Sequence, residues 1–146
     1  MRPRSFEGLE RFMGLRGYII IAEDNDDQRE LLAMLLEREG FEVEQACDGQ
    51  GLLDLVGRLR NQGDLSALTL IISDIMMPAV SGFDALEALR REHLNVPFVF
   101  LSALSDQQTL ARAKEMGALG VLRKPFDLNA MHQVLNELTL AAVSAA

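Results

Sequence analysis

The chain has 146 residues, 49% of them hydrophobic and 25% charged, which is the balance of a soluble globular domain with its own core. Its net charge of −8 disfavours direct binding of nucleic acid, because so acidic a surface repels the phosphate backbone. No apolar run approaches the ~18 residues of a membrane span, and no apolar signal-peptide core follows the first residues. The single cysteine, Cys47, can form no intrachain disulfide and is expected to be a small, semi-buried residue. We therefore expect one cytoplasmic domain without membrane contact.

Strand-like and helix-like segments alternate five times along the chain. The expected strands are apolar runs, except the second, which alternates apolar and polar residues and is therefore placed at a sheet edge. In chain order these strands cover 18–22, 41–46, 68–73, a run opened by Pro97, and 120–122. The expected helices cover 26–39, 50–60, 83–92, a segment capped by Ser105 or Asp106 and ended by Gly117, and a last segment capped by Asp127. A loop is expected at 61–66.

Repeated strand–helix units with short connections predict an α/β fold: a parallel sheet with helices on both faces and right-handed crossovers. An edge second strand and a central first strand fit the flavodoxin-like, doubly wound (βα)5 arrangement, whose five-stranded sheet has the order 2-1-3-4-5. We assign residues 17–140 to this domain. Residues 1–16 are expected to be an N-terminal extension, flexible or forming a short docking helix, and residues 141–146 a tail.

Polar residues follow four of the five expected strands. Glu23 and Asp24 follow the first strand, Asp74 the third, Ser102 the fourth and Lys124 the fifth. Parallel strands present their carboxyl ends at one edge, where open α/β sheets bind ligands. Three carboxylates gathered there repel one another and need a cation, and oxygen donors suit Mg²⁺, with the backbone carbonyl of Met76 as a further donor.

Asp74 is the expected reacting group at this edge. Its carboxylate can attack a phosphoryl group and form an acyl phosphate. Mg²⁺ and the Lys124 ammonium would neutralise the transferring oxygens, to one of which the Ser102 hydroxyl would donate a hydrogen bond.

The same residues lie in four short motifs. These are Ile21-Ala22-Glu23-Asp24-Asn25, Ile72-Ser73-Asp74-Ile75-Met76-Met77-Pro78 with Gly82, Leu101-Ser102-Ala103, and Lys124-Pro125-Phe126. With them, the chain resembles the receiver domain of two-component response regulators, of the CheY-like superfamily, over about residues 16–140. The resemblance implies phosphoryl transfer to Asp74 from the phosphohistidine of a histidine kinase or phosphotransfer protein. It also implies Mg²⁺ bound by Glu23, Asp24, Asp74 and the Met76 carbonyl, and a cis Lys124–Pro125 bond.

The chain departs from this family pattern in three ways. Val121 stands where the family usually has a tyrosine or phenylalanine that moves inward on activation, so the output is expected to be weaker or to appear as a shift of the loop after the fourth strand. No Lys or Arg follows Lys124, which disfavours the dimer of many DNA-binding regulators and leaves a monomer or weak dimer. The chain ends after its last helix, so we expect a stand-alone receiver or a piece of a larger regulator.

Three functions compete at this stage. The leading one is a phosphorylation-driven switch that changes a protein-binding face for a downstream protein and catalyses only its own phosphorylation and dephosphorylation. The second is a phosphorylation-independent pseudo-receiver acting as an interaction module, which only Val121 favours. The third is an aspartyl-phosphate phosphatase, which would need a second acidic residue two positions after its nucleophile, where this chain has Met76.

Overall fold

Five parallel strands form one sheet in the order β2-β1-β3-β4-β5, so the predicted order is confirmed and β2 lies at an edge. The computed structural model describes residues 17–103, 106–125 and 127–145. The strands are β1 (Gly17–Ala22), β2 (Phe41–Ala46), β3 (Leu68–Asp74), β4 (Phe98–Ser102) and β5 (Gly120–Arg123). The expected extension at 1–16 lies outside the described residues.

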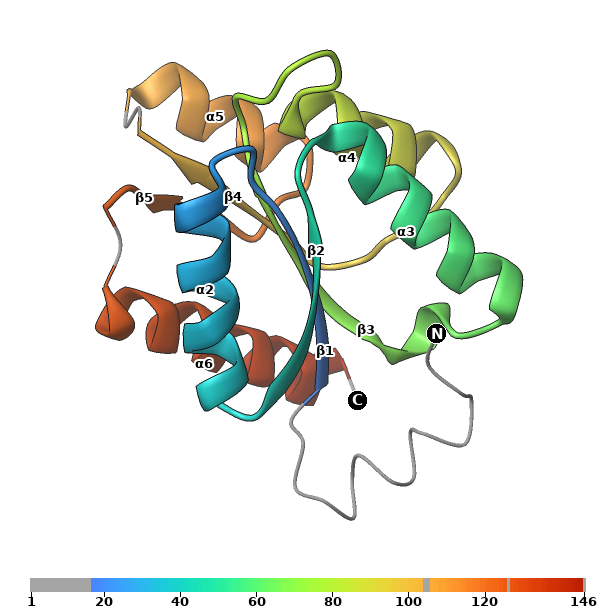
Figure 1. Cartoon of the computed structure of the whole chain (residues 1–146), viewed down its shortest axis with the longest axis horizontal. Helices are drawn as coiled ribbons and strands as arrows, with labels where there is room; N and C mark the ends of the chain where they lie inside the picture. Colours follow the sequence, from blue (N-terminus) through green and yellow to red (C-terminus); the bar gives the residue numbers. More distant parts are fainter. Residues whose placement is uncertain (1–16, 104–105, 126, 146) are drawn as a thin grey trace.

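Helices cover both faces of the sheet. They are α2 (Asp26–Arg38), α3 (Gly49–Gln62), the short 3-10 helix η1 (Leu65–Ala67), α4 (Gly82–Arg91), α5 (Gln107–Glu115) and α6 (Leu128–Ala145). As Figure 1 shows, α2 and α6 lie on one face, and α3, α4 and α5 lie on the other. In the part of the chain that is described, no helix combines the length and apolar character that crossing a membrane requires.

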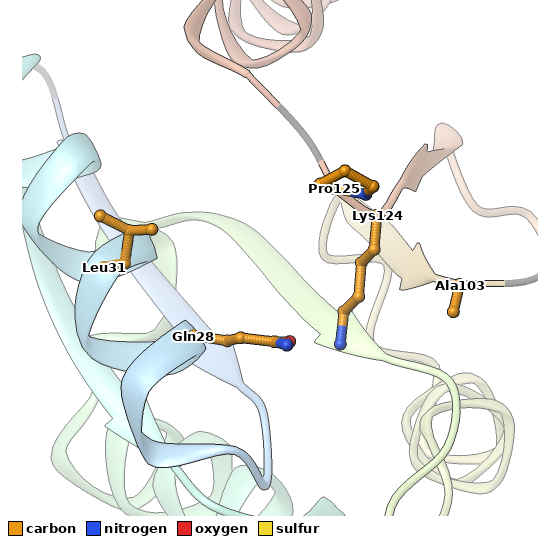
Figure 2. A pocket seen from close by; sticks show the side chains of 5 residues that line it. All are labelled: Gln28, Leu31, Ala103, Lys124 and Pro125. Atoms are coloured by element: carbon orange, nitrogen blue, oxygen red, sulfur yellow. The ribbon is translucent and has the colours of Figure 1, made fainter.

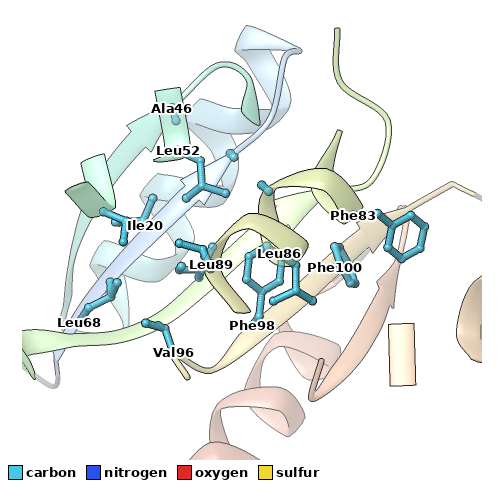
Figure 3. Packing of buried hydrophobic residues seen from close by; sticks show 14 of the residues in the cluster. Ile20, Ala46, Leu52, Leu68, Phe83, Leu86, Leu89, Val96, Phe98 and Phe100 are labelled. Atoms are coloured by element: carbon cyan, nitrogen blue, oxygen red, sulfur yellow. The ribbon is translucent and has the colours of Figure 1, made fainter. Parts of the chain in front are cut away.

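Two hydrophobic clusters separate along the central strands, because successive side chains of a strand point to opposite faces. Ile19 and Ile21 pack with α2 and α6, whereas Ile20 packs with α3 and α4. All three isoleucines are fully buried, and each such side chain contributes about 1.5–3 kcal/mol relative to an exposed one. The α3–α4 cluster contains the rings of Phe98 and Phe100, which Figure 3 shows under α4. Buried branched side chains on both faces explain why the first strand reads as a continuous apolar run.

Each of these helices begins after a short connection from the strand before it. Each first turn is capped by a side-chain oxygen that accepts a backbone N–H: Asn25 for α2, Asp48 for α3, Ser81 for α4, Asp106 for α5 and Asp127 for α6. Of the two caps expected for α5, Asp106 is the N-cap residue, and Ser105 lies outside the described residues. The helix N-termini therefore share an edge with the carboxyl ends of the strands, which favours anions there.

Three local expectations differ from the structure. The expected loop at 61–66 is shorter, because α3 continues to Gln62 and ends where Gly63 adopts a left-handed conformation (φ 75°), after which η1 forms. The last helix runs on to Ala145, so residues 141–145 continue it and do not form a separate tail. Cys47 is exposed, not semi-buried, at the start of the connection from β2 to α3.

Candidate functional site

The register of the sheet brings the polar strand ends together. Three aligned pairs define it: Ala22 with Ser73, Asp74 with Leu101, and Ser102 with Arg123. Because Glu23 directly follows Ala22 and Lys124 directly follows Arg123, both side chains lie beside Asp74 at the same edge. The structure thus gathers the residues that the sequence placed there, while their chemical roles stay predictions.

Lys124 bridges two carboxylates. Its Nζ donates to Glu23 Oε1 at 2.7 Å and to Asp74 Oδ2 at 2.6 Å. The side chains of Glu23 and Asp74 are only 1% and 9% exposed, so both charges are largely shielded from water. A buried carboxylate pair of this kind is tolerated only with a compensating cation, and the ammonium supplies that charge here.

The main chain around Asp74 is packed tightly against the start of α4. Asp74 Oδ1 accepts the backbone N–H of Met76 at 3.2 Å, and the carbonyl oxygen of Ile75 accepts the N–H of Gly82 at 2.9 Å. A Cβ on Gly82 would collide with the carbonyl oxygen of Asp74. Gly82, the glycine of the second motif, is therefore required by a close backbone approach, which fixes the main chain of Asp74 against the start of α4.

Glu23, Asp24 and Asp74 form the acidic cluster that the sequence predicted. One carboxylate oxygen from each lies within 4.8 Å of the others. Asp24 is exposed, whereas Glu23 Oε2 is buried and has no hydrogen-bond partner among the described residues. An orphaned buried carboxylate oxygen beside two further carboxylates fits a hard divalent cation such as Mg²⁺. Met76, expected to add its carbonyl oxygen, lies next to this cluster through its N–H bond to Asp74.

The electrostatics of the site favour proton or metal binding at Glu23. Burial raises the pKa of Glu23 to about 7, and the hydrogen bond and charge of Asp74 act in the same direction against the opposing effect of Lys124. Burial alone would lower the pKa of Lys124, but its hydrogen bonds to Asp74 and Glu23 outweigh that effect and raise this pKa. The ammonium therefore stays charged, whereas the carboxyl of Glu23 titrates near neutrality.

Ser102 closes β4 at the same edge. It is buried, and its carbonyl oxygen accepts the backbone N–H of Lys124 at 2.8 Å, so the ends of β4 and β5 are tied together. The Lys124–Pro125 peptide bond is cis, as the family resemblance implied.

Arg29 belongs to the site although sequence reasoning did not select it. Its Nη1 donates to the carbonyl oxygen of Glu23 at 2.9 Å, its Nε to Gln45 Oε1 at 3.2 Å and its Nη2 to Asp26 Oδ1 at 2.7 Å. One guanidinium thus ties the acidic loop to α2 and β2. The only sequence signal was the spacing of three residues between Asp26 and Arg29 in the first turn of α2.

A pocket of about 400 Å³ opens beside Lys124. It is lined by Gln28, Leu31, Ala103, Lys124 and Pro125. In Figure 2, Gln28 and Leu31 extend from α2 on one side, while Lys124, Pro125 and Ala103 lie on the other. Leu31 is half exposed, so the pocket offers an apolar wall close to the buried charges.

Comparison with known proteins agrees with this geometry. Residues 19–136 match the response regulator receiver domain family. The chain is 33% identical over 125 residues to the osmosensing histidine protein kinase SLN1 of Saccharomyces cerevisiae, covering 84% of this chain and 10% of that protein. It is 36% identical over 109 residues to the transcriptional regulatory protein CpxR of Escherichia coli K12, covering 75% of this chain and 43% of that protein.

Solved structures show the same fold. The chemotaxis protein CheY4 of Vibrio cholerae superposes with a TM-score of 0.74 at 27% identity, covering 84% of this chain and 98% of CheY4. The chain spans less than half the length of the curated relatives named above, so only its receiver portion is comparable with them. With matching motifs, sheet order and strand-end residues, the chain belongs to the family of response regulator receiver domains.

Proposed function

We propose that Asp74 accepts a phosphoryl group from a phosphohistidine of a histidine kinase or phosphotransfer protein, and that the phosphorylated chain signals through a changed protein-binding face. The observation that carries the proposal is the buried Asp74 carboxylate, held 2.6 Å from the Lys124 ammonium beside two further carboxylates. A site built only for stability would not need a third acid at this edge, because each added carboxylate increases the repulsion.

In the proposed reaction, a carboxylate oxygen of Asp74 attacks the phosphorus of the phosphohistidine. The new O–P bond forms as the P–N bond breaks, and the imidazole leaves with the electron pair and takes up a proton. Lys124 donates a hydrogen bond to Asp74, and the same ammonium group can donate to the phosphoryl oxygens during transfer. Ser102, buried at the end of β4, is the proposed hydroxyl donor to the same group.

Magnesium is part of the proposal. Glu23, Asp24, Asp74 and the backbone carbonyl of Met76 would hold the ion. When bound, Mg²⁺ would neutralise negative charge on the phosphoryl oxygens during transfer.

The pocket beside Lys124 supports transfer from a protein donor. Asp74 is 6% exposed, so a donor must insert its phosphohistidine side chain to reach the carboxylate. The pocket of about 400 Å³ is lined by Lys124, whose ammonium bonds Asp74, and offers room for a donor side chain beside that lysine. The chain is proposed to catalyse only its own phosphorylation and dephosphorylation. Since a phosphohistidine donor is formed from ATP, we place this chemistry in the cytoplasm.

The test is phosphorylation by acetyl phosphate and Mg²⁺, followed by the intact mass of the protein. Wild type should gain the mass of one phosphoryl group, and Asp74→Asn, which removes the attacking oxygen at nearly constant volume, should gain none. Asp54→Asn is the matched control, because Asp54 is an exposed aspartate of α3 that accepts a hydrogen bond from Gln50. No mass gain in wild type would favour the phosphorylation-independent interaction module, and undiminished gain in Asp74→Asn would refute the assignment of the acceptor.

A further inference from the structure

Among the α-helices whose side chains are all described, α5 buries the fewest residues. Of its nine residues, all described, only Ala113 is buried, whereas α4 buries five of its ten. Elements that bury few side chains open or move at low free-energy cost. Since α5 also follows β4 shortly after Ser102, its position can respond to events at the strand end.

One side chain of α5 makes a specific contact with the neighbouring helix. The guanidinium carbon of Arg112 lies 4.2 Å from the centroid of the Phe83 ring, which is 8% exposed in the first turn of α4. A guanidinium over an aromatic face is attracted by the ring quadrupole. We call this contact the Arg112–Phe83 latch.

Phe83 connects the latch to the phosphoacceptor site in two ways. It directly follows Gly82, whose backbone is pressed against the carbonyl oxygen of Asp74. Its ring also meets Phe100 edge to face, with centroids 4.8 Å apart at 61°, and Phe100 lies two residues before Ser102 on β4. Figure 3 shows Phe83 at the end of a row that continues through Phe100 to Phe98. Packing contacts therefore link the strand ends at Asp74 and Ser102 to the ring that carries Arg112.

Val121 cannot link the core to α5 through an aromatic ring. Val121 pairs with Phe100 in the sheet and packs against the same cluster, but it has no ring that could turn inward. Among the described residues, Phe83 makes an aromatic contact between the core and α5 through Arg112.

We propose that Arg112 is a positioning residue that holds α5 in its resting place through the Arg112–Phe83 latch. Phosphorylation of Asp74, whose main-chain carbonyl lies against Gly82 beside Phe83, weakens the latch and frees α5 to move. This inference rests on the proposed phosphorylation of Asp74 and names the residue through which that event reaches the surface.

The first experiment measures amide hydrogen exchange over 107–115 in the full chain without phosphoryl donor. Arg112→Ala should exchange about two- to fivefold faster than wild type, the fold-change that an exposed cation–π contact can supply. Arg112→Lys keeps a cation over the ring and should recover part of the protection. Lys114→Ala removes an exposed cation from the same helix and should behave like wild type.

The second experiment adds beryllium fluoride with Mg²⁺ as a phosphoryl mimic. Wild type should show faster exchange in α5 on binding, whereas Arg112→Ala should change little further and bind the mimic about two- to fivefold more tightly, because binding no longer works against the latch. Phe83→Leu keeps apolar volume without the ring. It should reproduce Arg112→Ala, and the double variant should add nothing to either.

Three outcomes would overturn the latch. These are equal exchange in Arg112→Ala and Lys114→Ala, additive effects of Arg112→Ala and Phe83→Leu, and an unresponsive α5 in wild type whose mass shows phosphorylation at Asp74. The last leaves the proposed function standing. A wild-type chain that gains no phosphoryl mass would instead reject the proposed function and, with it, the latch as a switch.

Discussion

At the residue scale, Lys124 decides how three acids can coexist at one sheet edge. Its ammonium is shared between Glu23 and Asp74 at 2.7 and 2.6 Å, so each carboxylate has a positive partner although both are buried. The main-chain bond from Lys124 to Ser102 ties the same residue to the end of β4. Lys124 thus contacts the Asp74 carboxylate through its side chain and the end of β4 through its main chain, so a change of charge at Asp74 can affect both.

Replacing Lys124 by alanine should slow phosphoryl transfer and uncouple phosphorylation from conformational change. The reason is that the variant has no ammonium group to bind the phosphoryl oxygens once they are attached to Asp74. The measurement is amide exchange over β4 and the start of α5, with and without the phosphoryl mimic. Lys124→Arg, which keeps a cation, is the control and should retain part of the response. If wild type and Lys124→Ala respond equally, Lys124 is not part of the switch.

The lifetime of the acyl phosphate is a second prediction at this scale. Met76, two residues past Asp74, is 69% exposed and apolar, and Leu104, two residues past Ser102, lies outside the described residues. Neither side chain can orient an attacking water through a hydrogen bond, so we expect slow self-dephosphorylation. Replacing Met76 by Asn and Leu104 by Glu should speed phosphate loss severalfold, since about tenfold needs only ~1.4 kcal/mol of barrier. The loss of phosphate is measured by intact mass over time. An unchanged rate in the double variant would show that these two side chains do not set the lifetime.

At the element scale, α4 supports the site because its first turn carries Gly82 and Phe83. A capping box fixes that turn: Ser81 Oγ accepts the N–H of Asp84 at 3.1 Å, and Asp84 Oδ2 accepts the N–H of Ser81 at 3.3 Å. The start of the helix is thereby defined independently of packing.

Removing the cap with Ser81→Ala should lower the free energy of unfolding by about 1 kcal/mol, because it leaves the backbone N–H of Asp84 without its partner. Urea denaturation followed by circular dichroism measures this change. Ser66→Ala, an exposed serine of η1, is the control and should stay within about 0.5 kcal/mol of wild type. Equal stability of the two variants would mean that the box contributes nothing to the native state.

At the scale of the whole molecule, the acidic site makes stability depend on pH and on metal. Glu23 has a folded pKa of about 7 against an ordinary value of 4.5, so the folded state keeps a proton that the unfolded chain loses between these values. As the pH rises through this window, the unfolded state binds fewer protons than the folded one. The contribution of Glu23 to the free energy of unfolding therefore falls as the pH rises, and the full loss is present above about 7.

Magnesium should restore the free energy of unfolding that is lost as the pH rises, because the ion supplies the positive charge that the proton on Glu23 supplied at lower pH. Millimolar Mg²⁺ should raise the melting temperature by the mass-action amount RT ln(1 + [L]/Kd), and more strongly as the pH rises toward and past about 7. Thermal melts from about pH 5 to about pH 8, with and without the metal, measure both trends. Glu23→Gln is the control, in which both the pH slope and the metal effect should shrink. A melting temperature indifferent to Mg²⁺ in wild type would argue against an intact metal site.

Much of the fold was predictable because its signals are local. The continuous apolar run at 18–22 and the alternating run at 41–46 follow from side-chain periodicity, and they place β1 in the centre and β2 at the edge. The strand ends in turn predicted the gathering of Glu23, Asp24, Asp74 and Lys124, which the parallel register brings about. Element ends were less predictable, since α3 stops only where Gly63 turns left-handed.

By itself, then, the sequence determined the strand order, the helix starts and the family, because periodicity, caps and motifs act over a few neighbouring residues. Only the tertiary structure decided what depends on contacts between distant segments. The raised pKa of Glu23 comes first from its burial and then from Asp74, a residue of β3 far along the chain. The stacking of Arg112 on Phe83 likewise joins two helices whose side chains meet only because β3, β4 and β5 lie side by side. Spacing along a chain cannot predict such contacts, because they depend on the register and packing of elements that the local pattern leaves free.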